Sequence, residues 1–115
     1  MANTFKVITK AGVTSADVIY TVAGSTTTVI LGLIIGNTTS SSVNATVTLG
    51  TDTSNRAGAN DESNQDVELI TTTPIPGNSS LELLAGNKVV METTDTLSVT
   101  GSGAVDVALS VMEIT

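Results

Sequence analysis

The sequence predicts an all-β protein: a single antiparallel β-sandwich or jelly-roll-like domain of about eight strands, spanning residues 1–115. Three observations support this prediction. The chain is rich in threonine, valine and isoleucine, whose β-branched side chains favour strands. Short segments alternate between apolar and polar residues, as strands with one buried face do. Clusters of glycine, proline, asparagine and serine separate these segments at even spacing, which is typical of antiparallel sandwiches.

The first two predicted strands are Thr4–Thr9 and Asp17–Val22. Residues 11–13, Ala-Gly-Val, are expected to form a turn between them. In the second strand, Val18, Tyr20 and Val22 share one face by alternation, so we expect all three to point inward.

The segment Val29–Ile35 contains only apolar residues and glycine. A membrane-spanning helix needs about 20 apolar residues, so this run is too short for one. It is rich in β-branched residues and has turn residues at both ends. We therefore expect a central strand over Thr27–Ile35 that is covered on both faces. Gly32 inside the run indicates a bend or a close approach of another backbone.

The strands that follow show clearer alternation. In Val43–Gly50 and in Ala104–Val111 the odd-numbered residues are apolar, so these residues are expected to face the core. No segment has the apolar stripe of a helix. The remaining predicted strands are Asp66–Thr72, Ser80–Leu84, Lys88–Glu92 and Thr96–Thr100.

The segment Thr51–Asp66 has no large apolar residue and is longer than most connections between strands. It is either a plain surface loop or a contact or ion-binding site. Its acids could offer oxygen ligands to Ca²⁺, but their spacing does not match an EF-hand loop. We therefore interpret them as solvated loop acids and predict no metal site. These acids are Asp52, Asp61, Glu62 and Asp66.

Composition excludes several classes of function. The chain has 11 acidic and 4 basic residues, a formal net charge of −7, which argues against nucleic-acid binding. It has no cysteine and no histidine, so common catalytic triads and common zinc sites are absent. The N-terminal residues lack the pattern of a signal peptide, and no membrane segment is expected.

Paired carboxylates are the remaining enzymatic possibility. Glu82, Glu92 and Asp95 lie near one another in the sequence, but their neighbours do not suggest the apolar cleft that a glycosidase pair needs. We therefore predict that the protein is not an enzyme and that it has no catalytic residue, no cofactor and no cofactor-binding residue.

Three stretches resemble a family of small virion structural proteins from tailed bacteriophages, common among marine and cyanobacterial phages. The first is Val18–Thr39, the second is Pro74–Val99 with its proline-containing turn and Gly-Asn-Lys turn, and the third is Ala104–Thr115 with its near-terminal glutamate. The motifs are strands and turns. The resemblance covers most of the chain except the segment 51–66.

The resemblance implies a capsid decoration (cement) protein. Such a protein is made in the host cytoplasm and lies on the outer capsid surface of the virion, where it stabilises the head by bridging capsid subunits. The implied partner is the major capsid protein. A homo-oligomer is also expected, with no nucleic acid and no membrane as partners. The alternative is a tail, collar or fibre accessory module that contacts a host-surface glycan, but Tyr20 is expected to be buried and so cannot serve as a sugar platform.

Partner contacts are predicted in the N-terminal segment Ala2–Lys10 and in the segment Thr51–Asp66, because termini and long loops can reach other molecules. The N-terminal segment could pair as a strand with a neighbouring molecule through an open sheet edge. The predicted contact residues are Phe5, Lys6, Lys10, Arg56 and Lys88.

Overall fold

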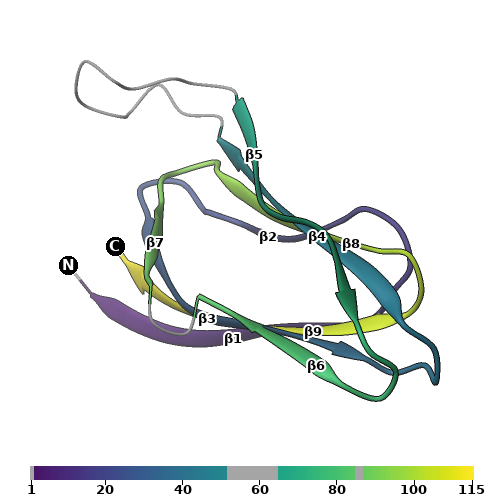
Figure 1. Cartoon of the computed structure of the whole chain (residues 1–115). Coiled ribbons are helices and arrows are strands. Elements are labelled where there is room, and N and C mark those ends of the chain that lie inside the picture. The colour runs from purple at the N-terminus through teal and green to yellow at the C-terminus, as the bar shows by residue number, and fades with distance from the viewer. Residues whose placement is uncertain (1, 52–64, 85–86) are drawn as a thin grey trace.

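Two antiparallel sheets pack face to face in a computed structural model that describes residues 2–51, 65–84 and 87–115 (Figure 1). Sheet A contains, in order, β1 (Asn3–Val13), β9 (Val105–Ile114), β3 (Thr27–Asn37) and β6 (Ser80–Leu83), and β7 (Val89–Met91) also pairs with β3. Sheet B contains, in order, β2 (Asp17–Thr21), β8 (Thr96–Gly101), β4 (Val43–Thr51) and β5 (Gln65–Ile75). The predicted all-β sandwich is thus confirmed. In the described residues there is no helix that is long and apolar enough to cross a membrane.

The core lies between the sheets and is made almost entirely of aliphatic side chains. The predicted inward faces of β4 and β9 are largely confirmed, because the odd-numbered residues from Val43 to Val47 and from Val105 to Val111 are buried. Each fully buried valine, leucine, isoleucine or methionine side chain contributes about 1.5–3 kcal/mol to the stability of the fold through its removal from water. The largest of them are Ile30, Leu33, Ile35, Ile75, Met91, Leu97 and Leu109.

The expectation that the central strand is covered on both faces is wrong. β3 alternates, with Leu33 and Ile35 buried while Ile34 between them is 46% exposed. The register against β9 shifts between Ile30 and Gly32, so the bend expected at Gly32 is present as a bulge. A Cβ at Gly32 would meet no atom within 4 Å, so the close approach expected there is absent.

Two further expectations about the first strands are wrong. Residues 11–13 do not form the predicted turn, because β1 continues to Val13 through a shift in register after Lys10. Gly12 permits this irregularity, since its φ of 68° is one that glycine adopts without a steric penalty. Val18 does not point inward: the register between β2 and β8 shifts between Val18 and Tyr20, and Val18 is exposed.

The N-terminal strand is paired within its own chain. β1 forms a ladder with β9 from Asn3↔Ile114 to Lys10↔Val107, so the segment expected to pair with a neighbouring molecule already has an intramolecular partner. Backbone hydrogen bonds join Ala2 and Thr115 in both directions, at 3.1 and 3.0 Å, and Figure 1 shows the two termini side by side. β1 is an edge strand of sheet A.

The end of β3 is fixed by one buried amide. Asn37 is 3% exposed, and its Nδ2 donates to the carbonyl oxygens of Ser41 at 2.8 Å and Ile75 at 2.9 Å. Its Oδ1 accepts from the backbone N–H of Thr39 at 2.9 Å. A Cβ at Gly77 would collide with the carbonyl oxygen of Ser40, so only glycine lets these two connections approach so closely. The amide therefore ties the β3–β4 connection to the β5–β6 connection.

Candidate functional site

The predicted contact residues occupy different environments. Phe5 is 69% exposed on β1, although it is the only phenylalanine in the chain. Lys6 and Lys10 point to the inner side of β1, where each forms an ion pair. Lys88 is exposed directly before β7. Arg56 lies outside the described residues.

The acids considered for chemistry are also separated. Asp52, Asp61 and Glu62 lie outside the described residues, and Asp66 is exposed on β5. Glu82 is exposed on β6, whereas Asp95 is fully buried and its Oδ2 accepts the backbone N–H of Glu92 at 3.0 Å. No group of three or more acidic side chains that could hold a metal ion occurs in the described part of the chain.

The feature that best fits a site is the outer face of sheet A, the side directed away from sheet B. The residues of this face are identified from burial and from strand register. The exposed residues of β9 point outward, and the residues that pair with them on neighbouring strands point to the same side. The two central strands, β9 and β3, place only one charged residue on this face, Asp106. The outer face of sheet A is composed mainly of Phe5, Val7, Thr9, Val29, Gly32, Ile34, Glu82, Val90, Asp106, Ala108, Ser110 and Met112.

Exposed apolar side chains are concentrated on this face. Six large hydrophobic residues are exposed among the described residues, and four of them belong to the outer face of sheet A. These four are Phe5 at 69%, Val7 at 64%, Val90 at 52% and Ile34 at 46%. Contiguous apolar surface of this kind marks interaction sites on proteins, whereas single exposed residues need no explanation.

The same face has two shallow hollows on either side of Ile34. One, of about 360 Å³, is lined by the small residues Gly36 and Ala108 together with Thr9 on β1. The other, of about 260 Å³, is lined by Leu31, Gly32 and Glu82 among others. The face therefore combines projecting apolar side chains with depressions that small residues create.

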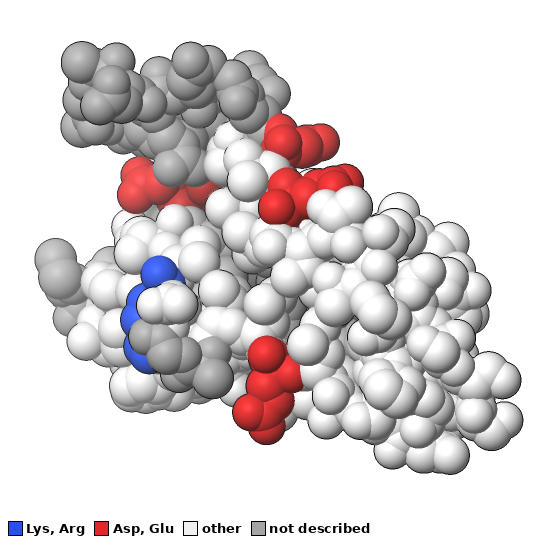
Figure 2. Space-filling view, viewed as in Figure 1, with Lys and Arg blue, Asp and Glu red and all other residues white. Residues whose placement is uncertain are grey.

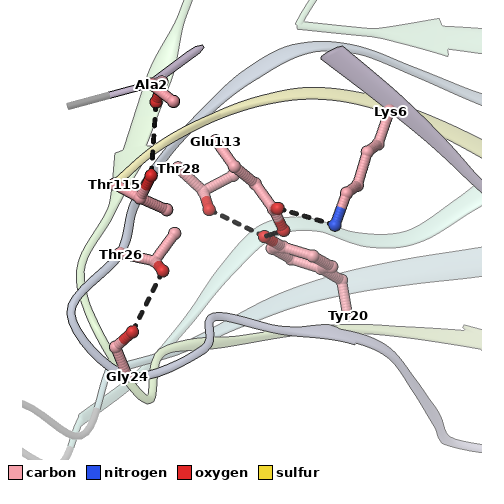
Figure 3. Close-up of polar contacts among 8 residues, drawn as sticks. All are labelled: Ala2, Lys6, Tyr20, Gly24, Thr26, Thr28, Glu113 and Thr115. Carbon is pink, nitrogen blue, oxygen red and sulfur yellow. Dashed lines mark hydrogen bonds and ion pairs between the residues drawn. The ribbon is translucent and has the colours of Figure 1, made fainter. Parts of the chain in front are cut away.

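A polar cluster lies on the opposite, inner side of sheet A and holds β1 in place (Figure 3). Lys6 Nζ lies 2.8 Å from Glu113 Oε1, and the Tyr20 hydroxyl donates to Glu113 Oε2 at 2.6 Å. The Tyr20 oxygen also lies 2.7 Å from Thr28 Oγ1. The cluster joins β1, β2, β3 and β9, so it links the two sheets at one end of the sandwich.

The pKa shifts of Glu113 and Tyr20 indicate that this cluster has a structural role. Hydrogen bonding to Lys6, and then to Tyr20, lowers the pKa of Glu113 from its ordinary value. Burial, followed by the hydrogen bond to Glu113, raises the pKa of Tyr20 from 10.0 to about 12. At neutral pH the carboxylate is charged and the phenol is neutral, so neither group is tuned to transfer a proton near pH 7.

Charge on the rest of the surface is unevenly placed. On the face seen in Figure 2, most acidic side chains lie towards one end, a further acidic group lies at the lower edge, and a wide area towards the other end is uncharged. Three connections at that other end contain no charged residue: 38–42, 76–79 and 102–104. Lys10, Asp17 and Asp106 lie near the same end of the sandwich. Binding through an uncharged surface requires less desolvation than binding through a densely charged one.

Sequence reasoning predicts Phe5 as a contact but misses the exposed face to which it belongs. The available signal was that β3 is apolar at both odd and even positions, and that the even positions of β9 include Ala108 and Met112. For Thr27–Ile35, sequence reasoning interprets the pattern as a strand covered on both faces by its own chain. Among the described residues, other parts of the chain cover only one of those faces.

No protein-family model and no curated protein matches the chain. Among solved structures, the chain is similar to one described as "Bacillus endospore appendages form a novel family of disulfide-linked pili". The identity is 14%, the TM-score is 0.49, and the match covers 97% of this chain and 84% of that one. A likeness of this strength carries no argument about function, and the present chain has no cysteine with which to form a disulfide.

Proposed function

We propose that the chain is a non-enzymatic structural subunit that works by associating with other proteins. Its specific form would be a capsid decoration protein on the outer surface of a tailed-phage head, with the major capsid protein as its partner. The observation that carries the general proposal is the apolar, nearly uncharged outer face of sheet A. The phage assignment rests on the resemblance of Val18–Thr39, Pro74–Val99 and Ala104–Thr115 to small virion proteins.

The physical properties of the chain fit this task. A sandwich with an aliphatic core and no cysteine folds without an oxidising compartment. A net charge of −7 keeps such a subunit away from packaged DNA, since like charges repel. The exposed Phe5 supplies the kind of aromatic anchor that dominates many protein interfaces.

The proposal is tested on purified particles. We expect the chain at a fixed ratio to the major capsid protein, as a repetitive coat requires. Particles that lack the chain should assemble but lose DNA at a lower temperature, or after a milder osmotic shock, than complete particles. Absence of the chain from purified particles would contradict the proposal.

The same particles separate this proposal from the host-contact alternative. If particles without the chain are as robust as complete ones but fail to adsorb to cells, the chain belongs to the adsorption apparatus. The structure gives that alternative little support, because Tyr20 is only 9% exposed and is hydrogen-bonded within the sandwich.

A further inference from the structure

The outward residues of sheet A form rows across the strands, because paired strands bring register partners side by side. The first row contains Phe5, Met112, Val29 and Val90. The middle row contains Val7, Ser110 and Gly32. The third row contains Thr9, Ala108, Ile34 and Glu82.

The first and third rows differ in shape. The first row carries four large apolar side chains, and Phe5 projects furthest into solvent. The third row contains Thr9 and Ala108, which line the larger hollow. The two rows lie at equal distances on either side of the middle row, two residues away along β1 and β9. One surface therefore offers both a projecting part and a part that could receive it.

We propose that two copies of this chain associate through the outer faces of their A sheets. The two copies are related by a two-fold axis that lies between the two faces and runs along the middle row, across the strands. The inference rests on the proposed function, since it names the partner of the same surface. A half-turn about this axis exchanges the first row of one copy with the third row of the other. Phe5 then faces the second copy's Thr9, and Met112 faces its Ala108.

Shape favours a second copy over an unrelated partner. In a two-fold interface one surface must complement itself, so residue i meets residue j and residue j meets residue i. A different partner would need only the projecting row or only the hollow. Here both are present at matched spacing on one face, and the β-branched pair Val29 and Ile34 would also meet across the axis. Sheets packed in this way lie about 10 Å apart with interleaved side chains.

Charge and area agree with the same partner. Glu82 is exposed in the third row, and Lys88 is exposed two residues before Val90 of the first row. The half-turn places Glu82 of each copy opposite Val90 of the other, two residues from Lys88. The register also puts Lys88 beside the middle row, so the two lysines approach each other near the axis, and each has a carboxylate of the other copy beside it. Four strand positions, each spanning about the nine residues from Thr28 to Gly36 of β3, give about 600 Å² for each copy. The resulting ~1,200 Å² lies at the lower limit of stable interfaces.

Sedimentation of the full chain over a range of concentrations tests the inference. We expect a monomer–dimer equilibrium at micromolar concentrations. Because Val7 lies on the axis, Val7→Asp would place two carboxylates against each other, and we expect it to raise the dissociation constant at least about tenfold. The matched control is Val18→Asp, which changes another exposed valine, on sheet B, and should leave the dissociation constant unchanged. A chain that is monomeric throughout, or a dimer that both variants affect alike, would overturn the inference.

Charge reversal tests where the axis lies. Glu82→Lys alone and Lys88→Glu alone should each weaken the dimer, since each places like charges together. The double variant should restore affinity, because the pairs re-form with opposite polarity. A double variant as weak as the two single variants would overturn the placement of the axis.

Failure of this inference is distinguishable from failure of the proposed function. A chain that is monomeric in solution but present in purified particles would overturn the dimer and leave the proposed function standing. A dimer that is absent from particles would overturn the proposed function and leave the dimer standing.

Discussion

The outer faces of the two sheets differ although the sheets share one sandwich. In sheet A the central strands β3 and β9 direct Val29, Ile34, Ala108 and Met112 away from the core. In sheet B the corresponding strands are β4 and β8, and their outward residues are Asn44, Thr46, Thr48, Thr96, Ser98 and Thr100. Both sheets contribute buried apolar residues to the core. The difference therefore lies in what each sheet presents to its surroundings and not in how each contributes to the core.

Threonine explains how sheet B stays compatible with water without losing strand propensity. Its branched Cβ suits a pleated backbone as valine does, while its hydroxyl bonds to water or to nearby backbone. Thr46, for example, accepts the backbone N–H of Thr72 through Oγ1 at 2.9 Å. Valine or isoleucine at such a position serves the strand equally well but leaves apolar surface in water. The fold alone does not require the outward valine and isoleucine of sheet A, whereas the proposed association would explain them.

The largest predicted effect separates the inner and outer positions of sheet A. Leu33→Ala removes a side chain that is 1% exposed, and we expect it to lower the free energy of unfolding by about 2–5 kcal/mol. Ile34→Ala, one residue later on the outer face, should lower it by less than about 1 kcal/mol. Urea titration of both variants at a concentration where the chain is monomeric measures the difference. Equal losses would show that Ile34 is covered within its own chain.

A second prediction concerns the polar cluster on the inner side of sheet A. Folding raises the pKa of Tyr20 from 10.0 to about 12, so the folded state holds the phenol proton more tightly than the unfolded state. The stability that this group contributes is complete below pH 10 and is lost as pH rises towards 12. We expect the wild-type chain to lose more stability than Tyr20→Phe over this interval, as measured by urea titration at successive pH values. A parallel decline in both chains would exclude this role for Tyr20.

The smallest predicted effect is on sheet B. Thr48→Val adds an apolar side chain at an outward position, and we expect the free energy of unfolding to change by no more than about 0.5 kcal/mol. The reverse change on sheet A, Val29→Thr, should be similarly mild for the monomer but should weaken association. Unfolding and sedimentation of the two variants, measured side by side, give both quantities. If Thr48→Val altered association as strongly as Val29→Thr, the contrast between the two faces would not hold.

The sequence predicts the strands best where alternation is strict. From Val43 to Val47 in β4 and from Val105 to Val111 in β9 the predicted faces are confirmed, because each odd position is apolar and the intervening positions are small or polar. Sequence reasoning fails where an unexpected bulge shifts the alternation, as at Val18, because a bulge depends on pairing with a distant strand. It also fails at residues 11–13, where pairing with β9 overrides the turn tendency of glycine.

The candidate site was only partly accessible to sequence reasoning, for two physical reasons. Hydrophobicity indicates that a side chain favours removal from water, but not whether its own chain or a second molecule covers it. The apolar run Val29–Ile35 was accordingly assigned to the core on both faces. The cluster of Lys6, Tyr20 and Glu113 joins three distant parts of the sequence, so no local pattern could reveal it.

Oxidative footprinting of the full chain by hydroxyl radicals tests most directly whether the outer face of sheet A is a contact surface. The account predicts that Phe5 and Met112 are oxidised more slowly at high concentration or in the assembled particle than in dilute solution, because a partner covers them. Met91 is fully buried in the core and should be protected in every state, while Val18 and Val67 on sheet B should react at unchanged rates. If Phe5 and Met112 were oxidised equally fast in the dilute and the associated states, the outer face of sheet A would not be the surface through which this protein associates.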